Sequence, residues 1–360
     1  MQVEPPSGER NVTDNRREAT VQIVERRTKV LLLAGGPTRE YRFLRNQLFR
    51  DKETIVHVLL QSARPGTAQE ADEILDEFPT EADDLFEYDA IVAFDPDWQS
   101  IDEEGIQLLE EWVSRQAGGL VVVAGPGFTP KWGGKRRGEL AISLLKGLYS
   151  VQFYNWGTSQ GLGRFGADQT SRLEFTRGGL ESEFLWLGES ASESEHAWAG
   201  FEGVYGYYAV KDVKPGATVY AHFVNDEEAL SPDDMPVFMA AHYYGAGRVF
   251  FLGSGEMWRI RRLDDAYFET FYTKLIRHVA AGRLQRDSKR GVLLVERSRY
   301  KLGDAINIQA RLTDAQHRPL TADETPKVDA IVAWPDGRQV TVPLRNVNLG
   351  GEALAGRKGM

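Results

Sequence analysis

The stretch VLLLAGGPTRE, residues 30–40, decides the fold class of this chain. Its first five residues are all apolar, which is typical of a β-strand that is covered on both faces. The segment Gly35-Gly36-Pro37-Thr38 then turns the chain, and apolar residues at helical spacing follow it. A buried strand that runs through a tight turn into an amphipathic helix is the opening unit of a parallel sheet with crossover helices.

The same rhythm continues along the next part of the chain. Three further apolar runs predict buried strands: residues 55–60 (IVHVLL), 88–94 (YDAIVAF) and 120–124 (LVVVA). We expect a short amphipathic helix over residues 71–78 between the first two. A second helix is expected from Ser100, because Glu103 three residues later gives the spacing of a capping box. Strands that alternate with helices in this way predict a doubly wound, mostly parallel α/β sheet.

The second half of the chain is less regular. Residues 154–216 show no clean periodicity, and we expect them to form an elaboration at the edge of the sheet with short antiparallel strands. The remaining predicted elements of this part are a helix over 140–148, strands over 218–223, 236–241 and 248–252, and a helix over 264–281 that ends at Gly282.

Composition limits the classes of function. The chain has 360 residues, enough for two domains, and a net charge of −10, so it carries no basic field that would attract nucleic acid. No apolar run is long enough to span a membrane, so we expect no direct membrane insertion by this chain. Cysteine is absent, and the six histidines lack metal-ligand spacing. The sequence therefore predicts no cofactor and no metal site of the usual histidine and cysteine types.

Two loops at predicted strand ends carry chemistry-bearing side chains. Asp95 and Asp97 follow the strand 88–94, where paired carboxylates can hold a hard cation or act as acid and base, and Trp98 offers a stacking surface. Asp and Pro are also ordinary turn residues, which is the simpler interpretation. The turn before Arg39 and Glu40 can hold an anion, but it lacks the glycine patterns of nucleotide-binding loops.

Two later loops complete the edge of the predicted sheet. The loop Gly125-Pro126-Gly127 has no residue that can act as a nucleophile. Ser254 and Glu256 follow the strand 248–252, but Ser254 has no base beside it in sequence. If a small ligand binds, we expect it at the shared edge of the strands, and the predicted contact residues are Arg39, Glu40, Asp95, Asp97, Trp98, Trp258 and Arg259. This set favours a polar, hydroxylated or zwitterionic ligand, although the same charges can simply neutralise one another.

The segments VLLLAGGPTREYRFLRNQLFRD, YDAIVAFDPDW, GGLVVVAGPG and YGAGRVFFLGSGEMWR occur in this order. Together they resemble the class I glutamine amidotransferase-like domains, which have a flavodoxin-like fold. More closely, they resemble large bacterial proteins, common in planctomycetes, in which such a domain lies among β-sandwich and von Willebrand A-type segments, often beside membrane helices. The resemblance covers residues 29–283. It implies a parent protein that is associated with a membrane, whose other domains are the partners of this module.

An active member of that family uses a Cys on the turn after a central strand and a His after a later one. The matching positions here lie near residues 125–127 and 254–258, and they hold neither residue. Without a thiolate, glutaminase activity is not expected. We therefore favour a non-catalytic scaffold or ligand-recognition module. The alternatives are a hydrolase that uses rim carboxylates or Ser254, with carbohydrate as a candidate substrate, and a metal-assisted binder at Asp95 and Asp97.

The chain divides into four predicted parts. Residues 1–28 are a loop and a strand, interpreted as the remnant of a preceding β domain, and residues 29–283 are the α/β domain. Residues 284–290 (LQRDSKR) are charged and form the predicted linker. Residues 291–360 then show strand signals over 292–295, 305–310, 329–334 and 339–344 and a Gly-rich end. They predict an incomplete, immunoglobulin-like β-sandwich.

Overall fold

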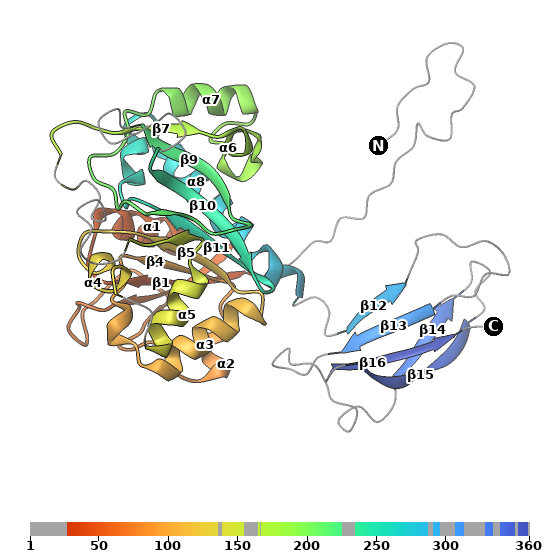
Figure 1. The fold of residues 1–360 in the computed structure, drawn as a ribbon. Helices are drawn as coiled ribbons and strands as arrows, with labels where there is room; N and C mark the ends of the chain where they lie inside the picture. Colours follow the sequence, from red (N-terminus) through yellow and green to blue (C-terminus); the bar gives the residue numbers. More distant parts are fainter. Residues whose placement is uncertain are drawn as a thin grey trace, which may run out of the picture.

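The computed structural model describes residues 27–135, 139–154, 165, 167–224 and 235–286, together with the backbone of five later strands between residues 291 and 358. The predicted strand over 20–24 lies outside the described residues. The main body is built on a nine-stranded sheet with the order β3-β2-β1-β4-β5-β11-β10-β9-β7 (Figure 1).

Six neighbouring strands of this sheet run parallel. They are β3 (Glu73–Ile74), β2 (Thr54–Leu60), β1 (Thr28–Ala34), β4 (Ala90–Phe94), β5 (Gly119–Val123) and β11 (Gly247–Leu252). The residues of β4 and β5 are all buried, as their uninterrupted apolar sequences predict. The α/β class with a mostly parallel central sheet is thereby confirmed.

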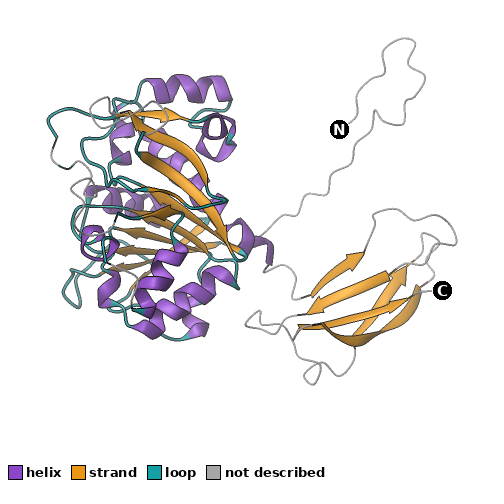
Figure 2. Cartoon of the chain, viewed as in Figure 1, coloured by secondary structure: helices purple, strands orange, loops and turns teal. Residues whose placement is uncertain are grey.

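Helices cover both faces of the sheet (Figure 2). On one face, α1 (Arg39–Arg50) and α8 (Asp265–Arg286) pack against the even-numbered residues of β1. On the other face, α2 (Ala82–Leu85), α3 (Glu103–Ser114) and α5 (Leu140–Leu148) pack against its odd-numbered residues. The period-2 alternation of a strand thus gives β1 two apolar faces, and each has its own helix layer.

Antiparallel strands extend the sheet beyond β11. β10 (Val237–Tyr244) pairs with β11, β9 (Thr218–Val224) with β10, and β7 (Arg172–Phe175) with β9. The irregular segment supplies β7 and β8 (Asp212–Val213), which agrees with the expected short antiparallel strands, and β8 pairs with β6 (Val151–Gln152) just before that segment. The remaining short elements are η1 (Trp98–Ser100), α4 (Thr129–Gly133), α6 (Arg177–Glu181), η2 (Glu183–Leu185), α7 (Ala191–Ala199) and η3 (Met257–Arg262).

The helix predicted over residues 71–78 is wrong. The backbone of this segment pairs with β2 instead: Asp72 N donates to Val56 O, and Leu75 N donates to Val58 O. The carboxylate of Asp72 also accepts a hydrogen bond from Val56 N at 2.8 Å. These bonds fix the two-residue edge strand β3, whose side chains are exposed and therefore carry no alternation signal.

Two predicted helix limits also differ from the structure. The cap of α3 is Asp102, which accepts from Gly105 N at 2.8 Å, whereas Ser100 lies in the preceding 3-10 turn. The last helix, α8, runs through Gly282 to Arg286. Gly282 is tolerated there because it packs closely on Ala117, where a Cβ would lie 3.1 Å from the Ala117 side chain. The predicted linker therefore begins inside a helix, and its residues 287–290 lie outside the described part of the chain.

The later strands form one antiparallel sheet in the order β12-β13-β16-β15-β14. Their bounds are β12 (Gly291–Val295), β13 (Asn307–Leu312), β14 (Val328–Ala333), β15 (Gln339–Leu349) and β16 (Glu352–Lys358). The four predicted strands are present, and the Gly-rich end, which was not expected to pair, supplies β16 between β13 and β15. The described strands make up a single sheet, so the predicted immunoglobulin-like sandwich stays a prediction.

Among the helices that the structure describes, none combines the length and the apolar character needed to cross a membrane.

Candidate functional site

The carboxyl ends of β1, β4, β5 and β11 lie next to one another, and the loops that follow them form one rim of the sheet. The first two loops touch closely. A Cβ at Gly35 would lie 2.3 Å from the backbone oxygen of Asp95, so only glycine fits at that point. The structure therefore brings the predicted site residues to one rim, but their side chains divide into two groups with different surroundings.

Both oxygens of the Asp95 carboxylate accept hydrogen bonds from residues of the loop after β5. Its Oδ2 accepts from Gly127 N at 2.7 Å and from Phe128 N at 3.1 Å, and its Oδ1 accepts from the backbone N and the hydroxyl of Thr129, both at 2.7 Å. The residue adopts φ 40°, a left-handed conformation that Asp tolerates better than most residues. The carboxylate thus stabilises the loop that leads into α4, and its acceptor positions are used internally.

The two neighbours of Asp95 also have structural partners. Asp97 accepts from Gln99 N at 3.2 Å as the cap of η1, and Gln61 bonds both its N and its O. The side chain of Trp98 is only 2% exposed, and its Nε1 donates to the hydroxyl of Tyr149 at 2.8 Å. A ring buried in this way cannot stack on a ligand, so the role predicted for Trp98 does not fit this conformation.

Glu40 is a fully buried carboxyl group. Its Oε2 accepts from Trp258 N at 2.8 Å, and its Oε1 accepts from the hydroxyl of Tyr272 at 2.6 Å. Burial raises the pKa of Glu40 to about 8, and the nearby charge of Glu256 raises it slightly, while the two hydrogen bonds oppose the shift. Glu40 therefore fixes the start of η3 against α1 and α8 and does not itself face solvent.

The other predicted residues form a stack that does reach solvent. The guanidinium carbon of Arg39 lies 4.9 Å from a ring centroid of Trp258, and that of Arg259 lies 4.7 Å from the Trp258 ring and 4.4 Å from the ring of Tyr205. Glu256 holds Arg259 by an ion pair at 2.6 Å and also accepts from Tyr205 N at 3.0 Å. We call these four residues, Arg39, Trp258, Arg259 and Tyr205, the arginine–aromatic stack.

Arg39 has a distinct position within the arginine–aromatic stack. Its side chain is exposed, and no carboxylate of the described residues forms an ion pair with it. Its guanidinium is positioned over the Trp258 ring while its N–H donors remain available. An Arg fork beside an aromatic face suits a ligand that has an anionic group next to a planar or apolar part.

Ser254 does not have the surroundings of a nucleophile. It is 2% exposed, and its hydroxyl donates to Gly206 O at 2.5 Å. Glu256, the candidate base, is bonded to Arg259 and Tyr205. In the described part of the chain, His, Asp and Glu side chains form no group of three that would hold a metal ion. The carboxylates and the serine therefore do not converge in one pocket.

The sequence interpretation missed two contacts of the candidate site, those of Tyr205 with Arg259 and of Tyr272 with Glu40. Tyr205 belongs to the irregular segment, so no periodic signal connected it with the loop after β11. Tyr272 has the helical spacing of a core residue, and the only sign of its hydrogen bond is a carboxyl group, Glu40, at a position of α1 that faces the core.

Comparison with known proteins shows no matching family model and no matching curated protein. Among solved structures, the chain is similar to the cytoplasmic protein STM1381 from Salmonella typhimurium LT2, at 14% identity and a TM-score of 0.46, covering 70% of this chain and 99% of that one. It is also similar to a ThuA-like protein from Parabacteroides merdae, at 14% identity and a TM-score of 0.40, covering 72% and 91%.

A third similar structure is the β-galactosidase from Rahnella sp. R3, at 13% identity and a TM-score of 0.39. The match covers 93% of this chain but only 41% of that enzyme. With such low values, none of these likenesses carries an inference about activity. The assignment of the fold rests on the strand order and pairing described above.

Proposed function

We propose that residues 29–283 form a non-catalytic, ligand-recognition module of the glutamine amidotransferase-like, flavodoxin-like type. The observation that carries this proposal is the hydrogen bonding of Asp95. Acyl-transfer enzymes need backbone N–H groups after a central strand to stabilise an oxyanion. Here the N–H groups of Gly127, Phe128 and Thr129 already bind the Asp95 carboxylate.

The proposed binding face is the arginine–aromatic stack. Arg39 and Arg259 lie against Trp258, and of these two only Arg259 has an ion-pair partner among the described residues. A small ligand with a carboxylate or phosphate group can therefore bind Arg39 and place its apolar part along the aromatic side chains. Glu40 contributes by accepting a hydrogen bond from the backbone N of Trp258. Asp95, Asp97 and Trp98 stabilise the neighbouring loops.

A thermal-shift screen with small carboxylates and phosphates tests this function. An active compound should raise the melting temperature of the wild type and lose its effect in Arg39→Gln. The matched control is Arg42→Gln, which removes the same charge from an exposed position of the same helix. If Arg42→Gln abolishes the effect as fully as Arg39→Gln, the ligand responds only to net charge, and the proposed face is wrong.

We further propose that the module belongs to a larger bacterial protein, associated with a membrane, whose other domains are its partners. The sequence resemblance supports this, since it combines the motifs of residues 29–283 with flanking β segments. Membrane fractionation of the native organism, with an antibody against this module, should detect a product larger than this chain in the membrane fraction. A product of this size in the soluble fraction alone would contradict it.

The alternative function is a hydrolase that uses rim carboxylates or Ser254, with carbohydrate as its candidate substrate. Such an enzyme requires Ser254 to leave the carbonyl oxygen of Gly206 and a base to approach it. Hydrolysis of nitrophenyl glycosides or nitrophenyl acetate that is lost in Ser254→Ala and in Glu256→Gln would establish this alternative. Hydrolysis that persists in both variants would show that neither Ser254 nor Glu256 is the catalytic residue.

A further inference from the structure

A pocket near the amino ends of the parallel strands is lined mainly by acidic side chains. It has a volume of about 370 Å³, within the range of roughly 300–1,000 Å³ that is typical of small-molecule sites. Its walls come from the start of β1, from β2 and β3, from residues 75–80, and from α2 and the segment that follows it. We call it the acidic pocket. The arginine–aromatic stack, in contrast, follows the carboxyl ends of the strands, so the two sites are separate.

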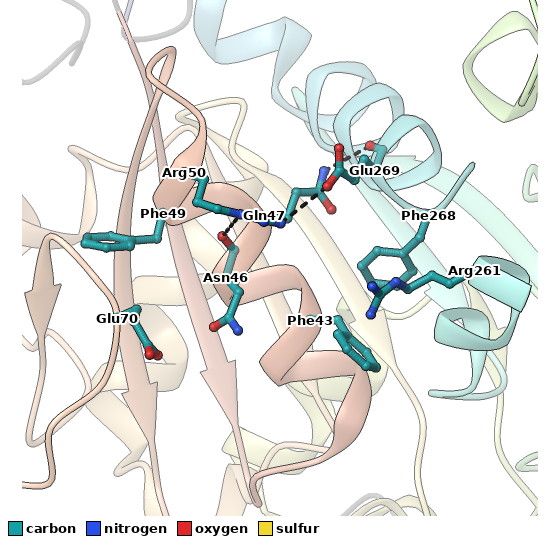
Figure 3. A pocket seen from close by; sticks show the side chains of 9 residues that line it. All are labelled: Phe43, Asn46, Gln47, Phe49, Arg50, Glu70, Arg261, Phe268 and Glu269. Atoms are coloured by element: carbon teal, nitrogen blue, oxygen red, sulfur yellow. Dashed lines mark hydrogen bonds and ion pairs between the residues drawn. The ribbon is translucent and has the colours of Figure 1, made fainter. Parts of the chain in front are cut away.

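Charge distinguishes the acidic pocket from a pocket of the same volume beside α1. The charged side chains of the pocket beside α1 are two arginines and two glutamates, and Arg50 lies 3.4 Å from Glu269 (Figure 3). The described residues that line the acidic pocket include five carboxylates and a single ammonium group, that of Lys29. The carboxylates belong to Glu73, Asp76, Glu77, Asp84 and Glu87. The acidic pocket therefore favours a positively charged ligand.

The sequence around the acidic pocket has the same bias. Residues 65–114 contain seventeen Asp or Glu residues and no Lys, Arg or His. Most of these acidic side chains are exposed, and those of Asp76, Glu77 and Asp84 form no ion pair with a described residue. Their negative charge is therefore available to a cation from solution.

One lining residue, His57, offers a hydrogen-bond acceptor that the protein does not use. His57 is 6% exposed, and its Nδ1 lies 2.9 Å from the Tyr88 hydroxyl and 3.1 Å from Oε2 of Glu73. Burial lowers the pKa of His57 below its ordinary value, the charge of Lys29 adds to the shift, and nearby carboxylates oppose it. The neutral ring carries its proton on Nδ1, because the Glu73 carboxylate can only accept.

This tautomer leaves Nε2 of His57 as an acceptor. Nε2 has no hydrogen-bond partner among the described residues, and it is not fully buried. Since His57 lines the acidic pocket, a ligand N–H group can reach this atom. An acceptor at this position adds a directional contact to the general attraction of the carboxylates.

The ring of Tyr88 already has an ammonium group beside it. Nζ of Lys29 lies 5.2 Å from the ring centroid and forms an ion pair with Glu87. Burial raises the pKa of the Tyr88 hydroxyl, and the charges of Glu73, Glu87 and Asp84 raise it further, so these carboxylates lie around one ring. A carboxylate together with an aromatic face is a combination that binds organic ammonium groups.

The spacing of the carboxylates favours an elongated cation over a metal ion. Carboxylate ligands of a hard cation such as Ca²⁺ must converge to roughly 2.3–2.6 Å from one point. In the described part of the chain, no three His, Asp or Glu side chains are close enough to do so. The negative charges are therefore distributed along the walls of the acidic pocket, and a ligand with separated positive charges can pair with several of them.

We propose that the acidic pocket binds a polyamine, a linear organic cation with two or more ammonium groups. One ammonium group donates to Nε2 of His57, and the others pair with carboxylates of the walls, among them Glu77 and Asp84. The methylene chain between them packs on partly buried apolar residues of the lining, Leu75 and Pro79. This site is independent of the proposed function, because no residue of the arginine–aromatic stack lines it.

The test is titration calorimetry with the full chain in 150 mM NaCl, where attraction by distant surface charges is screened. The probes are putrescine, spermidine and spermine, with butylamine as a single ammonium group and Mg²⁺ as a compact divalent cation. Spermidine or spermine should bind with a dissociation constant of about 0.1 mM or tighter. Butylamine and Mg²⁺ should bind at least about tenfold more weakly, since neither can pair with separated carboxylates.

Two sets of variants locate the bound polyamine. The double variant Glu77→Gln/Asp84→Asn removes two exposed carboxylates of the acidic pocket and should weaken binding about tenfold. Its matched control, Glu81→Gln/Asp83→Asn, removes two equally exposed charges that do not line the acidic pocket and should change binding less than about twofold. His57→Phe keeps a ring but removes Nε2, and should weaken binding about fivefold.

Several results would overturn the proposal: no polyamine binds, butylamine or Mg²⁺ binds as tightly as spermidine, or the control double variant weakens binding as much as Glu77→Gln/Asp84→Asn. Unchanged affinity in a folded His57→Phe variant would also overturn it. If His57→Phe does not fold, the two double variants still decide the matter, because they alter only exposed side chains.

Discussion

Oδ1 of Asp95 lies 2.7 Å from the backbone nitrogen of Thr129 and 2.7 Å from its hydroxyl oxygen. These bonds tie the loop after β4 to the loop after β5, and the glycine at position 125 makes the approach possible. A Cβ there would lie 2.6 Å from the Asp95 Cβ. The loop after β5 is therefore fixed by a neighbouring carboxylate.

Asp95→Ala should destabilise the protein strongly. The substitution leaves the donors of residues 127–129 without their acceptor and places Ala at φ 40°, and together these effects should cost about 3 kcal/mol of unfolding free energy. Denaturation in urea measures the change. Asp97→Ala is the control, since it removes a single cap bond and should cost about 1 kcal/mol. Equal losses of unfolding free energy in both variants would show that the Asp95 hydrogen bonds stabilise the protein no more than the single cap bond of Asp97.

Glu40 should make the stability of the protein depend on pH. Its pKa is about 8 in the folded protein against 4.5 for an ordinary Glu, so unfolding releases a proton between these limits. The folded state binds more protons there, and stability must therefore fall as pH rises from about 5 to about 8. Glu40→Gln should flatten this dependence, because its uncharged amide can accept from Trp258 N and donate to the Tyr272 hydroxyl. Urea denaturation at several pH values measures it, and the exposed Glu53→Gln should behave as the wild type does.

The chain should release no ammonia from glutamine above the rate of a buffer control. Cysteine is absent from the sequence, and the loop over residues 125–127 presents only Gly and Pro. A coupled ammonia assay checks this. Release that exceeds the control, and that disappears when residues 125–127 are changed, would mean that the chain uses a different nucleophile.

The sheet of residues 291–358 should exchange its amide hydrogens faster than the central strands of the α/β body. β12 and β14 are its two edge strands, and edge strands have backbone groups without a partner strand. β1 and β5 have a neighbour on each side and are buried. Hydrogen exchange followed by mass spectrometry compares them, and equal protection in both regions would show the later sheet to be a complete, stable unit.

The parallel strands could be predicted because uninterrupted apolar runs such as LLL at 31–33 arise when a strand is buried on both faces. β3 could not be predicted, because its two exposed residues are held by backbone hydrogen bonds to β2. Such bonds do not require particular residue types. The candidate site could not be predicted for a similar reason, because its contacts join residues that are distant in sequence. Asp95 looked like a ligand-binding carboxylate, but its partners lie 32 to 34 residues further along the chain.

Trp98 and Trp258 are a second example of positions that the local sequence cannot distinguish. Both are Trp residues in loops at the rim, so local sequence gives them the same interpretation. Trp98 is buried and donates a hydrogen bond to Tyr149, whereas Trp258 is only partly buried and contacts two arginines. Only tertiary contacts separate a core tryptophan from one at the rim that contacts arginines.

The position of β11 beside β5 also has a consequence for biosynthesis. β5 ends at Val123, but the strand that completes its hydrogen bonding begins at Gly247. A ribosome adds about 5–20 residues per second, so one edge of the half-made sheet lacks its partner for on the order of ten seconds. Until β11 emerges, the nascent chain carries an apolar strand edge, the kind of surface that chaperones bind and that neighbouring nascent chains can pair with.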